Sequence, residues 1–561
     1  MATEVQQQSL WKPTLGIALL GALIFFPFLG GVHLFDWDEI NFAEISREML
    51  LTGDYGRVYI DYQPFWEKPP LFFWLQSATM AMLGVGEYAA RLPNAVCGAI
   101  SLAVLFRLGA SIGGVRLGYI WAGVYLGSVL PMLYFKSGII DPVFNLFIFL
   151  GLYYFIRAYW KHNGIAAPGK DRSVWALFAL SGWFIGLAML TKGQAAYMIA
   201  ALTFGVYWVY QRFRLYITIP QFLWFTIFAA LVTLAWFGWE TWKNGPFFVT
   251  EFVKYQWRLF STPDAGHKGF PGYHIVVQLV GCFPASIFAL QAFLRRPQAQ
   301  AQEEAAYRAD FRRWMKFLFW TVIVLFSIVQ SKIVHYSSLA YFPLTYLAAE
   351  VIDRWWAEGR TLPRWASRGL WMVGGLYVMA TLALPWIGKN IAILRDKVSD
   401  PFARGNMEAD VVWTGWEVLP GLWLLGVLLL ATRNLAKGKW PAGLATLFGG
   451  VTLFVLLTLG FAVGRIEGYS QRAAIEFFES LKGRDVYATT YGYKSYAHLF
   501  YAGKRPGLDA RSHDREWLLH GDVDKDVYIS TKVHKAAELD SLGYLERLYE
   551  KNGFVFFVRK R

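Results

Sequence analysis

Long apolar runs recur along this chain from about residue 13 to residue 464. We count about thirteen of them, each of roughly 20 residues, which is the length that an α-helix needs to cross a bilayer. The approximate spans are 13–33, 88–108, 117–135, 142–160, 174–191, 194–211, 219–239, 274–294, 314–331, 336–352, 369–388, 412–431 and 441–464. A soluble fold could not cover the apolar surface of a chain with 56% hydrophobic and 17% charged residues. The sequence therefore predicts a polytopic α-helical membrane protein. Its membrane domain is expected to comprise residues 1–464.

Basic residues follow alternate apolar runs, and their placement orients the chain. They occur at Arg107 and Arg116, between Arg157 and Arg172, at Arg212 and Arg214, between Arg295 and Arg313, between Arg354 and Arg368, and between Arg433 and Lys439. The positive-inside rule assigns these loops to the cytoplasm. With an odd number of spans, the N-terminus lies inside and the C-terminus outside. The net charge of +14 then reflects orientation and contact with anionic lipids, so a nucleic acid is not expected as a partner.

The last part of the chain has a different composition. Residues 465–561 mix charged residues with short β-rich runs that begin at Asp485, Asp526 and Phe554. Helical stretches are expected at 471–481 and near 493–501. This pattern predicts a soluble α/β domain outside the membrane, on the periplasmic side.

Two outward loops, 34–87 and 240–273, are long and rich in charged and aromatic residues. Within the first, the apolar stretch 71–84 is too short to span and is expected to be interfacial or re-entrant. Ahead of it, three acids fall within four residues, at Asp36, Asp38 and Glu39. Asp38 could serve as the N-cap of a helix lying on the membrane. One cap needs only one acid, so the cluster indicates chemistry at the membrane surface.

A second cluster in the same loop is Glu67-Lys68-Pro69-Pro70. The two prolines stiffen the loop behind Lys68, and an ammonium group suits a phosphate as a point charge. The alternative is a lysine that snorkels to the interface.

Further charged groups lie at the outer ends of spans. Asp141 precedes Pro142 and could simply cap a helix, while Lys192 occupies the tight turn Thr191-Lys192-Gly193. Other polar candidates on this side are Arg258, His267, Lys268, Lys332, His335 and Tyr336. Two phosphates about 4 Å apart would repel by about 4 kcal/mol at an effective dielectric near 20, and positioned cations can offset that repulsion. Ionisable groups gathered at one membrane face therefore indicate a site for anionic substrates.

Several kinds of site are not expected. The sequence has neither a G-x-x-x-x-G-K-[ST] loop nor a dinucleotide-binding fingerprint, so a nucleotide-dependent enzyme has little support. Cys97 and Cys282 both fall in apolar spans, which argues against a disulfide framework or a cysteine metal site. An outward-facing enzyme would instead need a donor that the membrane carries, such as a polyprenyl-phosphate sugar.

These residues resemble a known family. Trp37-Asp38-Glu39, the run Ala43–Leu50, Thr52-Gly53-Asp54 and Glu67-Lys68-Pro69-Pro70 are similar to motifs of the lipid A aminoarabinose transferases. These are bacterial relatives of the protein O-mannosyltransferases with the C-type glycosyltransferase fold. Asp141-Pro142, Thr191-Lys192-Gly193, and Ser331-Lys332 with Tyr336 follow in the order that the family shows. The resemblance covers the membrane part and is weaker in the C-terminal domain.

The resemblance implies transfer of 4-amino-4-deoxy-L-arabinose from undecaprenyl phosphate to a lipid A phosphate at the periplasmic face of the inner membrane. The added amine would weaken the binding of polymyxin and other cationic antimicrobial peptides. Asp38 and Asp141 are the expected catalytic residues, with Asp38 first. The expected substrate-binding residues are Lys68, Lys192, Glu67, Arg258, Lys332 and Tyr336. No cofactor is expected to be required, and the protein is expected to be a monomer.

Three alternatives remain open. A sibling enzyme could use a polyprenyl-phosphate sugar to modify a protein or another envelope glycan. A lipid-linked sugar flippase is a different class, which should place polar groups along a path through the bilayer midplane. A divalent metal could bind Glu67 together with a histidine, although the sequence shows no convincing ligand spacing.

Overall fold

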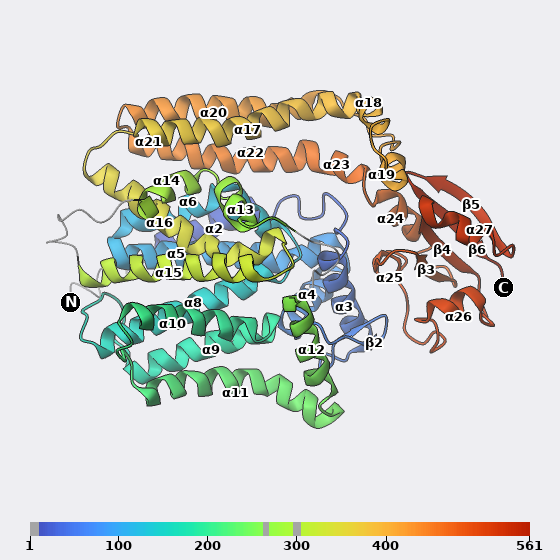
Figure 1. The fold of residues 1–561 in the computed structure, drawn as a ribbon, viewed down its shortest axis with the longest axis horizontal. Coiled ribbons are helices and arrows are strands. Elements are labelled where there is room, and N and C mark those ends of the chain that lie inside the picture. The colour runs from blue at the N-terminus through green and yellow to red at the C-terminus, as the bar shows by residue number, and fades with distance from the viewer. Residues whose placement is uncertain (1–9, 262–268, 295–304) are drawn as a thin grey trace.

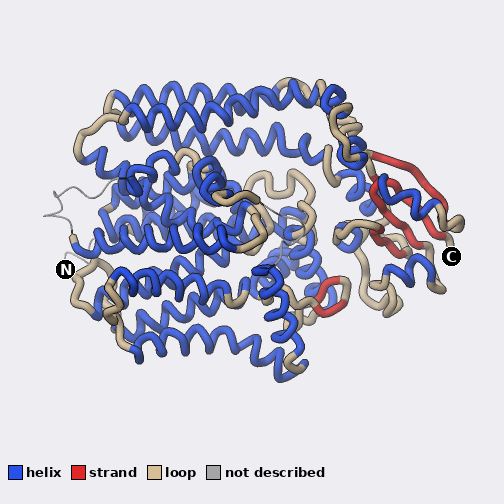
Figure 2. The backbone as a smooth tube through the Cα atoms, in the orientation of Figure 1, coloured by secondary structure: helices blue, strands red, loops and turns tan. Residues whose placement is uncertain are grey.

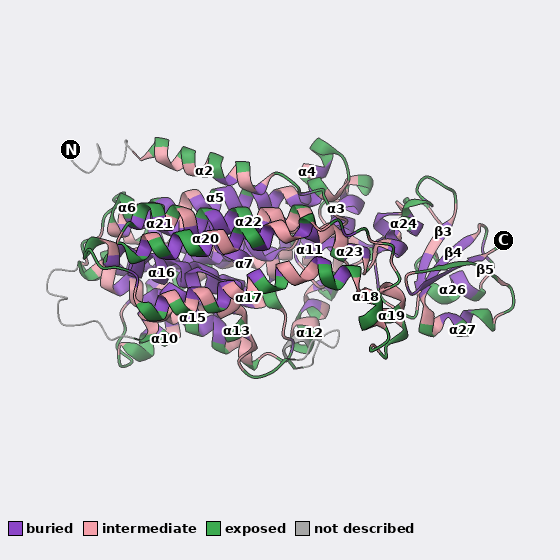
Figure 3. Ribbon diagram, turned by 90° about the horizontal axis from the view of Figure 1, so that it is seen from above, coloured by how far each residue is buried: buried purple, intermediate pink, exposed green. Residues whose placement is uncertain are grey.

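The computed structural model describes residues 10–261, 269–294 and 305–561. Most of the chain forms a bundle of roughly parallel helices, and a smaller unit with a β-sheet lies at one end of it (Figures 1 and 2). In the bundle, buried residues face the interior between helices, whereas many exposed residues on the outer helices are large and apolar (Figure 3). An apolar outer surface of this kind suits contact with lipid.

Within the described residues, seven helical segments are long and apolar enough to cross a membrane, judged by length and composition. They are α5 (Glu87–Gly113), α8 (Asp141–His162), α9 (Val174–Lys192), α11 (Ile219–Asn244), α17 (Arg364–Lys389), Trp416–Ala436, which contains η5 (Trp416–Val418) and α20 (Leu419–Ala436), and Trp440–Gly468. The last of these contains α21 (Trp440–Leu444), η6 (Ala445–Gly449), α22 (Gly450–Thr458), η7 (Leu459–Val463) and α23 (Gly464–Gly468).

An eighth candidate is a pair of helices bent by 79°, formed by α6 (Val115–Leu126) and the segment Val129–Lys136. That segment contains α7 (Val129–Leu133) and η1 (Tyr134–Lys136). Shorter apolar helices are α2 (Trp11–Phe25), α4 (Leu71–Leu83), α10 (Ala195–Tyr210) and α14 (Ala285–Leu294). The remaining helices of the bundle are α13 (Tyr273–Gly281), α15 (Ala306–Ile328), η4 (Val334–Ala340) and α16 (Tyr341–Ala357). Each expected span thus overlaps a helix, but the count of thirteen crossings stays a prediction.

Helix boundaries follow local capping chemistry. Ser173 accepts a hydrogen bond from the backbone N–H of Ala176 at the start of α9. Thr218 and Gln221 form a reciprocal capping box at the start of α11. These side chains satisfy amide groups that the first turn of a helix leaves without partners.

Between the bundle and the C-terminal unit lie the elements of the two long loops (Figure 1). They are α3 (Asp38–Thr52), β1 (Tyr59–Ile60), β2 (Gln63–Pro64) and α12 (Phe247–Ser261). The helix α3 does not lie exposed on a membrane surface as its periodicity suggested, because residues 39–49 are all buried. It ends at Gly53, whose left-handed conformation (φ 69°) lets its N–H reach the carbonyl of Met49, which explains the glycine in Thr52-Gly53-Asp54.

The C-terminal unit contains a four-stranded sheet of order β3-β4-β6-β5, in which β3 and β4 are parallel and the other pairs antiparallel. Its elements are α24 (Arg472–Glu479), β3 (Tyr487–Tyr491), α25 (Ala497–Phe500), α26 (Arg515–His520), β4 (Val527–Lys532), η8 (Val533–Lys535), α27 (Ala536–Asp540), β5 (Leu545–Lys551) and β6 (Phe554–Arg559). The short helices α18 (Ile391–Arg395) and α19 (Pro401–Asn406) follow α17 and lie beside this unit (Figure 1).

The C-terminal unit shares a hydrophobic core with the first long loop. Leu34, Ile40 and Met80 belong to the same buried cluster as Phe477 and Phe478 of the unit. Polar contacts reinforce this packing, since Leu34 N donates to the Tyr501 hydroxyl at 2.8 Å. The unit therefore stabilises the loop that carries the acid cluster, while the predicted domain boundary at 464/465 stays a prediction.

Candidate active site

Asp38 is the first residue of α3, directly after Trp37. Asp38 is not the N-cap that its position suggested, because Trp37 occupies that place with a φ of 76°. The Asp38 side chain is 41% exposed, and its Oδ2 lies 3.4 Å from His335 Nε2. The carboxylate therefore faces an accessible region and a titratable partner.

Asp141 is the first residue of α8. The N-cap is Ile140, so Asp141 does not cap the helix as its position before Pro142 suggested. The Asp141 side chain is 4% exposed, and Lys192 Nζ donates to its Oδ1 at 2.6 Å. A buried carboxylate needs such a partner to remain charged. Lys192 also lies against aromatic rings, with its Nζ 5.1 Å from the centre of the Tyr336 ring.

The glycine of Thr191-Lys192-Gly193 has a structural reason. Gly193 adopts a φ of +89°, and a Cβ there would meet the Phe252 ring at 2.2 Å. Only glycine allows both the left-handed conformation and this close approach. The turn thereby holds Lys192 at the end of α9 and brings α12, which carries Phe252, against it.

His335 joins the two acids. Its Nε2 lies 3.4 Å from Asp38 Oδ2 and 3.9 Å from Asp141 Oδ2. The four side chains Asp38, His335, Asp141 and Lys192 come from α3, η4, α8 and the end of α9, and together they form what we call the acid–base cluster. His335 is one of several basic candidates in the sequence, but no motif distinguishes it from the neighbouring Lys332 and Tyr336, so the sequence alone assigns it no role.

A second group of side chains joins Lys68 of the first long loop to two residues of α12. Lys68 Nζ donates to the Tyr255 hydroxyl at 3.2 Å and lies 4.7 Å from the centre of the Tyr255 ring. The Arg258 guanidinium carbon lies 5.1 Å from the same ring centre. We call Lys68, Tyr255 and Arg258 the α12 cluster. Because Phe252 on the same helix contacts Gly193, α12 connects this cluster to the turn that holds Lys192.

Two other expected binding residues have different surroundings. Lys332 Nζ donates to carbonyl oxygens at the end of α15, including Ser327 O at 2.7 Å and Phe326 O at 3.1 Å. Its ammonium group thus stabilises the C-terminus of that helix. Glu67 lies close enough to the C-terminal unit for its charge to add to burial in raising the pKa of Tyr496. Substrate binding by Lys332 and Glu67 stays a prediction.

The other two acids of the first cluster have structural partners. Both carboxylate oxygens of Glu39 accept hydrogen bonds from Arg91, at 3.0 and 2.7 Å, in a pair that is almost fully buried. Although burial opposes ionisation, Arg91 lowers the pKa of Glu39. Asp36 contacts the C-terminal unit, where its N–H donates to Gln471, and burial raises the pKa of its carboxyl. Of the three acids Asp36, Asp38 and Glu39, Asp38 is therefore the one that belongs to the acid–base cluster.

A metal at Glu67 stays a prediction. Among the described residues, the metal-compatible group of three or more side chains is His33, Glu87 and Glu479, which does not include Glu67. His267 and Lys268, the nearest basic candidates in the second long loop, lie outside the described residues.

The chain is similar to known proteins in both sequence and fold. Residues 67–239 match the family described as dolichyl-phosphate-mannose-protein mannosyltransferase. A Proteus mirabilis protein named undecaprenyl phosphate-alpha-4-amino-4-deoxy-L-arabinose arabinosyl transferase 1 is 25% identical over 324 residues, which is 56% of this chain and 55% of the relative. An Aeromonas salmonicida transferase of the same kind is 25% identical over 396 residues, 68% of this chain and 67% of the relative.

The chain is similar in structure to the crystal structure of ArnT from Cupriavidus metallidurans bound to undecaprenyl phosphate. It covers 97% of both chains with a TM-score of 0.74 and 17% sequence identity. The resemblance to the aminoarabinose transferases is confirmed. The C-type glycosyltransferase fold with a small C-terminal sheet unit is confirmed as well, and the chain is a multi-pass membrane protein.

The matched regions bear on the site. The mannosyltransferase-family match contains Glu67, Lys68, Asp141 and Lys192, whereas Asp38 and His335 lie outside it. The sequence match to the Proteus aminoarabinose transferase spans about half of that protein's length. The acid–base cluster therefore rests on the geometry of this chain itself.

Proposed function

We propose that this chain transfers 4-amino-4-deoxy-L-arabinose from undecaprenyl phosphate to a phosphate group of lipid A. The observation that carries the proposal is the acid–base cluster, in which Asp38 and Asp141 both lie near Nε2 of His335 and Asp141 pairs with Lys192. A shared fold does not by itself define a reaction. The proposal therefore combines this geometry with the sequence similarity to transferases named for that donor and sugar.

The chemistry needs little deprotonation, because a phosphate acceptor is already ionised. An oxygen of the acceptor phosphate attacks the anomeric carbon, the bond from that carbon to the donor phosphate oxygen breaks, and undecaprenyl phosphate leaves. Positive charge develops on the sugar ring, where the Asp38 carboxylate would stabilise it, while negative charge grows on the leaving phosphate. Lys192 and Lys68 would hold that phosphate, and Arg258 and Tyr336 would contact donor or acceptor groups.

The reaction takes place, on this proposal, at the periplasmic face of the bacterial inner membrane, and the added amine gives resistance to polymyxin and other cationic peptides. The distribution of basic loops supports a cytoplasmic N-terminus and a periplasmic C-terminal unit. An alkaline phosphatase fused at the C-terminus should be active and one fused after Arg360 inactive. The opposite pair of results would contradict this orientation.

The acceptor is the point on which the alternatives differ. A protein or another envelope glycan would also receive sugar from a polyprenyl phosphate, and the mannosyltransferase-family match covers part of this chain. Purified protein should be incubated with the polyprenyl-linked aminoarabinose in three parallel reactions. The first contains lipid A, the second an unfolded periplasmic protein and the third no acceptor. Sugar on lipid A alone supports the proposal. Sugar on protein identifies the sibling enzyme, and donor movement across vesicles without transfer identifies a flippase.

We expect the transfer to require no cofactor and the protein to act as a monomer. Treatment of the purified protein with a chelator should therefore leave the transfer rate unchanged. A loss of activity that added divalent metal restores would contradict this expectation.

A further inference from the structure

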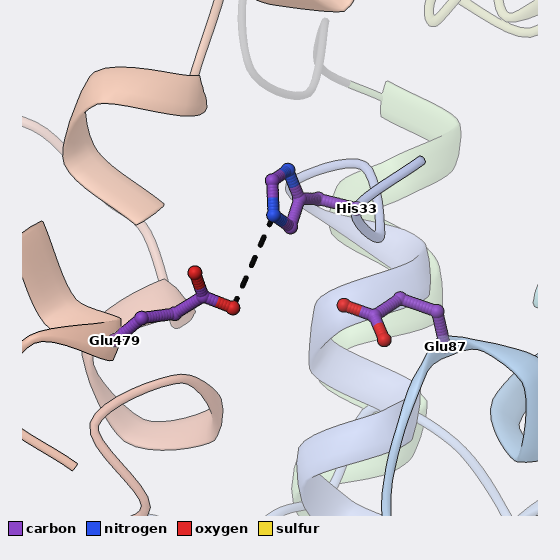
Figure 4. Close-up of side chains that lie close together, drawn as sticks. All are labelled: His33, Glu87 and Glu479. Carbon is purple, nitrogen blue, oxygen red and sulfur yellow. Dashed lines mark ion pairs between the residues drawn. The ribbon is translucent and has the colours of Figure 1, made fainter. Parts of the chain in front are cut away.

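Three side chains from distant parts of the chain converge beside the junction of the membrane part and the C-terminal unit. His33 lies between α2 and α3, Glu87 is the first residue of α5, and Glu479 is the last residue of α24. One ligand atom of each lies within 4.8 Å of those of the other two. Figure 4 shows both carboxylates directed toward the space beneath the imidazole ring.

The imidazole is oriented by a buried carboxylate. His33 Nδ1 lies 3.0 Å from Glu467 Oε1, and the Glu467 side chain is only 1% exposed. Arg472 holds the other oxygen of Glu467. An acceptor at Nδ1 favours the tautomer with its proton on that nitrogen, which leaves the Nε2 lone pair available toward Glu479 Oε1 at 3.9 Å. Histidines that bind metals commonly donate their second N–H to a carboxylate in this way.

The backbone of His33 is also fixed before any ligand arrives. Arg91 donates hydrogen bonds to the carbonyl oxygens of His33 at 2.9 Å and Val32 at 2.9 Å. The His33 ring packs edge-on against Tyr501, with ring centres 5.6 Å apart. A site whose first ligand is held on three sides loses little entropy when it binds an ion.

The charges of the cluster favour a cation. Among the described residues, neither Glu87 nor Glu479 forms an ion pair with a lysine or an arginine. Arg472 forms its ion pair with Glu467. The carboxylates of Glu87 and Glu479 leave negative charge that a divalent ion would neutralise. The site is open to solvent, since the side chains of His33 and Glu479 are 23% and 45% exposed.

We propose that His33, Glu87 and Glu479 bind a divalent transition-metal ion such as Zn²⁺, which fastens the C-terminal unit to the membrane part. One imidazole nitrogen and two carboxylate oxygens suit Zn²⁺, with bonds of about 2.0–2.2 Å and a water in the fourth position. Ligand atoms of a tetrahedral site lie about 3.3 Å apart, so the carboxylates must move inward by about 1 Å. The exposed Glu479 side chain can make most of this movement.

The test is a metal titration of the full-length protein, purified without a histidine tag and stripped of metal with a chelator. Calorimetry with Zn²⁺, and the visible absorption of Co²⁺ as a substitute, should both report a site in the wild-type protein. Glu479→Gln and His33→Asn should each weaken Zn²⁺ binding at least about tenfold. Zn²⁺ should raise the unfolding temperature of the wild-type protein but not that of Glu479→Gln.

Matched variants keep the test specific. Glu476→Gln alters an acid on the same helix that pairs with Lys551, and His520→Asn alters an exposed histidine on α26. Both should bind Zn²⁺ like the wild-type protein, as should Glu67→Gln. If His33→Asn fails to fold, Glu87→Gln and Glu479→Gln decide the matter, because neither is a core residue. Absence of Zn²⁺ binding by the wild-type protein, or unchanged binding in the Glu87 and Glu479 variants, overturns the proposal and leaves His33 as an ion-pair partner of these acids.

Discussion

His335 Nε2 lies 3.4 Å from Asp38 Oδ2, which joins a residue at the start of α3 to one almost 300 positions later in the sequence. The same nitrogen is 3.9 Å from Asp141 Oδ2. One imidazole nitrogen near two carboxylates links residues of α3, η4 and α8. His335 is therefore the residue through which the acid–base cluster is assembled.

His335→Ala should lower the turnover number for aminoarabinose transfer at least about tenfold, because both carboxylates lose their shared partner. His335→Gln keeps a hydrogen-bond donor and should retain more activity. The measurement is steady-state transfer by purified protein, with kcat and KM determined separately. His534→Ala, an exposed histidine in η8, serves as the control. Wild-type values for both parameters in His335→Ala would remove His335 from the site.

Asp141 and Lys192 should behave as one unit. Because Lys192 Nζ and Asp141 Oδ1 are 2.6 Å apart, Lys192→Met leaves a nearly buried carboxylate without its partner. Asp141→Asn and Lys192→Met should each reduce transfer, and the double variant should lose less than the two single losses combined. The transfer rates of the four proteins give the coupling. Strictly additive losses would show that the two residues act independently.

Lys68 distinguishes phosphate binding from anchoring at the interface. Lys68→Glu should impair transfer strongly, with most of the effect in the KM for the polyprenyl-linked donor. Lys68→Arg should keep partial activity, since it preserves the charge beside Tyr255 but changes the geometry. Equal activity of the two variants would favour an interfacial lysine with no substrate contact.

Glu39 should matter for stability rather than for chemistry. Glu39→Gln leaves Arg91 with an uncompensated buried charge, and we expect a loss of about 3–5 kcal/mol in unfolding free energy. Arg91 holds the pKa of Glu39 below its ordinary value of 4.5 despite burial, so the pair contributes stability above that pH and loses it as the pH falls further. Thermal unfolding in detergent from pH 7 to pH 3 should therefore show a steeper acid loss for the wild-type protein than for Glu39→Gln. Parallel curves would contradict the assignment.

Much of this architecture could be predicted from local patterns. Apolar periodicity located the helices, and the composition change near residue 465 located the sheet unit, because both signals are local in the sequence. Strand β5 (Leu545–Lys551) was not predicted, since it is largely exposed and carries little of the apolar alternation that identifies a strand.

The candidate site was harder to predict because it is assembled from distant segments. The sequence showed that three acids exceed the need for a single cap, but it could not show that Glu39 pairs with Arg91 on α5. It likewise could not show that His335 reaches Asp38, or that Lys332 is engaged at the end of α15. Several residues of the same chemical type lie in similar loops of the sequence. Only the tertiary structure decides which of them come into contact.

The most direct test of the account concerns Asp38, the exposed carboxylate of the acid–base cluster. Lipid A should be extracted from a bacterial strain that lacks its own aminoarabinose transferase and expresses this protein, and analysed by mass spectrometry. Wild-type protein should add aminoarabinose to lipid A, whereas Asp38→Asn, present at equal levels in the membrane, should reduce the modified fraction at least about a hundredfold. Asp396→Asn, an exposed acid after α18, should behave like the wild-type protein. Modified lipid A at wild-type levels in the Asp38→Asn strain would contradict the central role of this carboxylate.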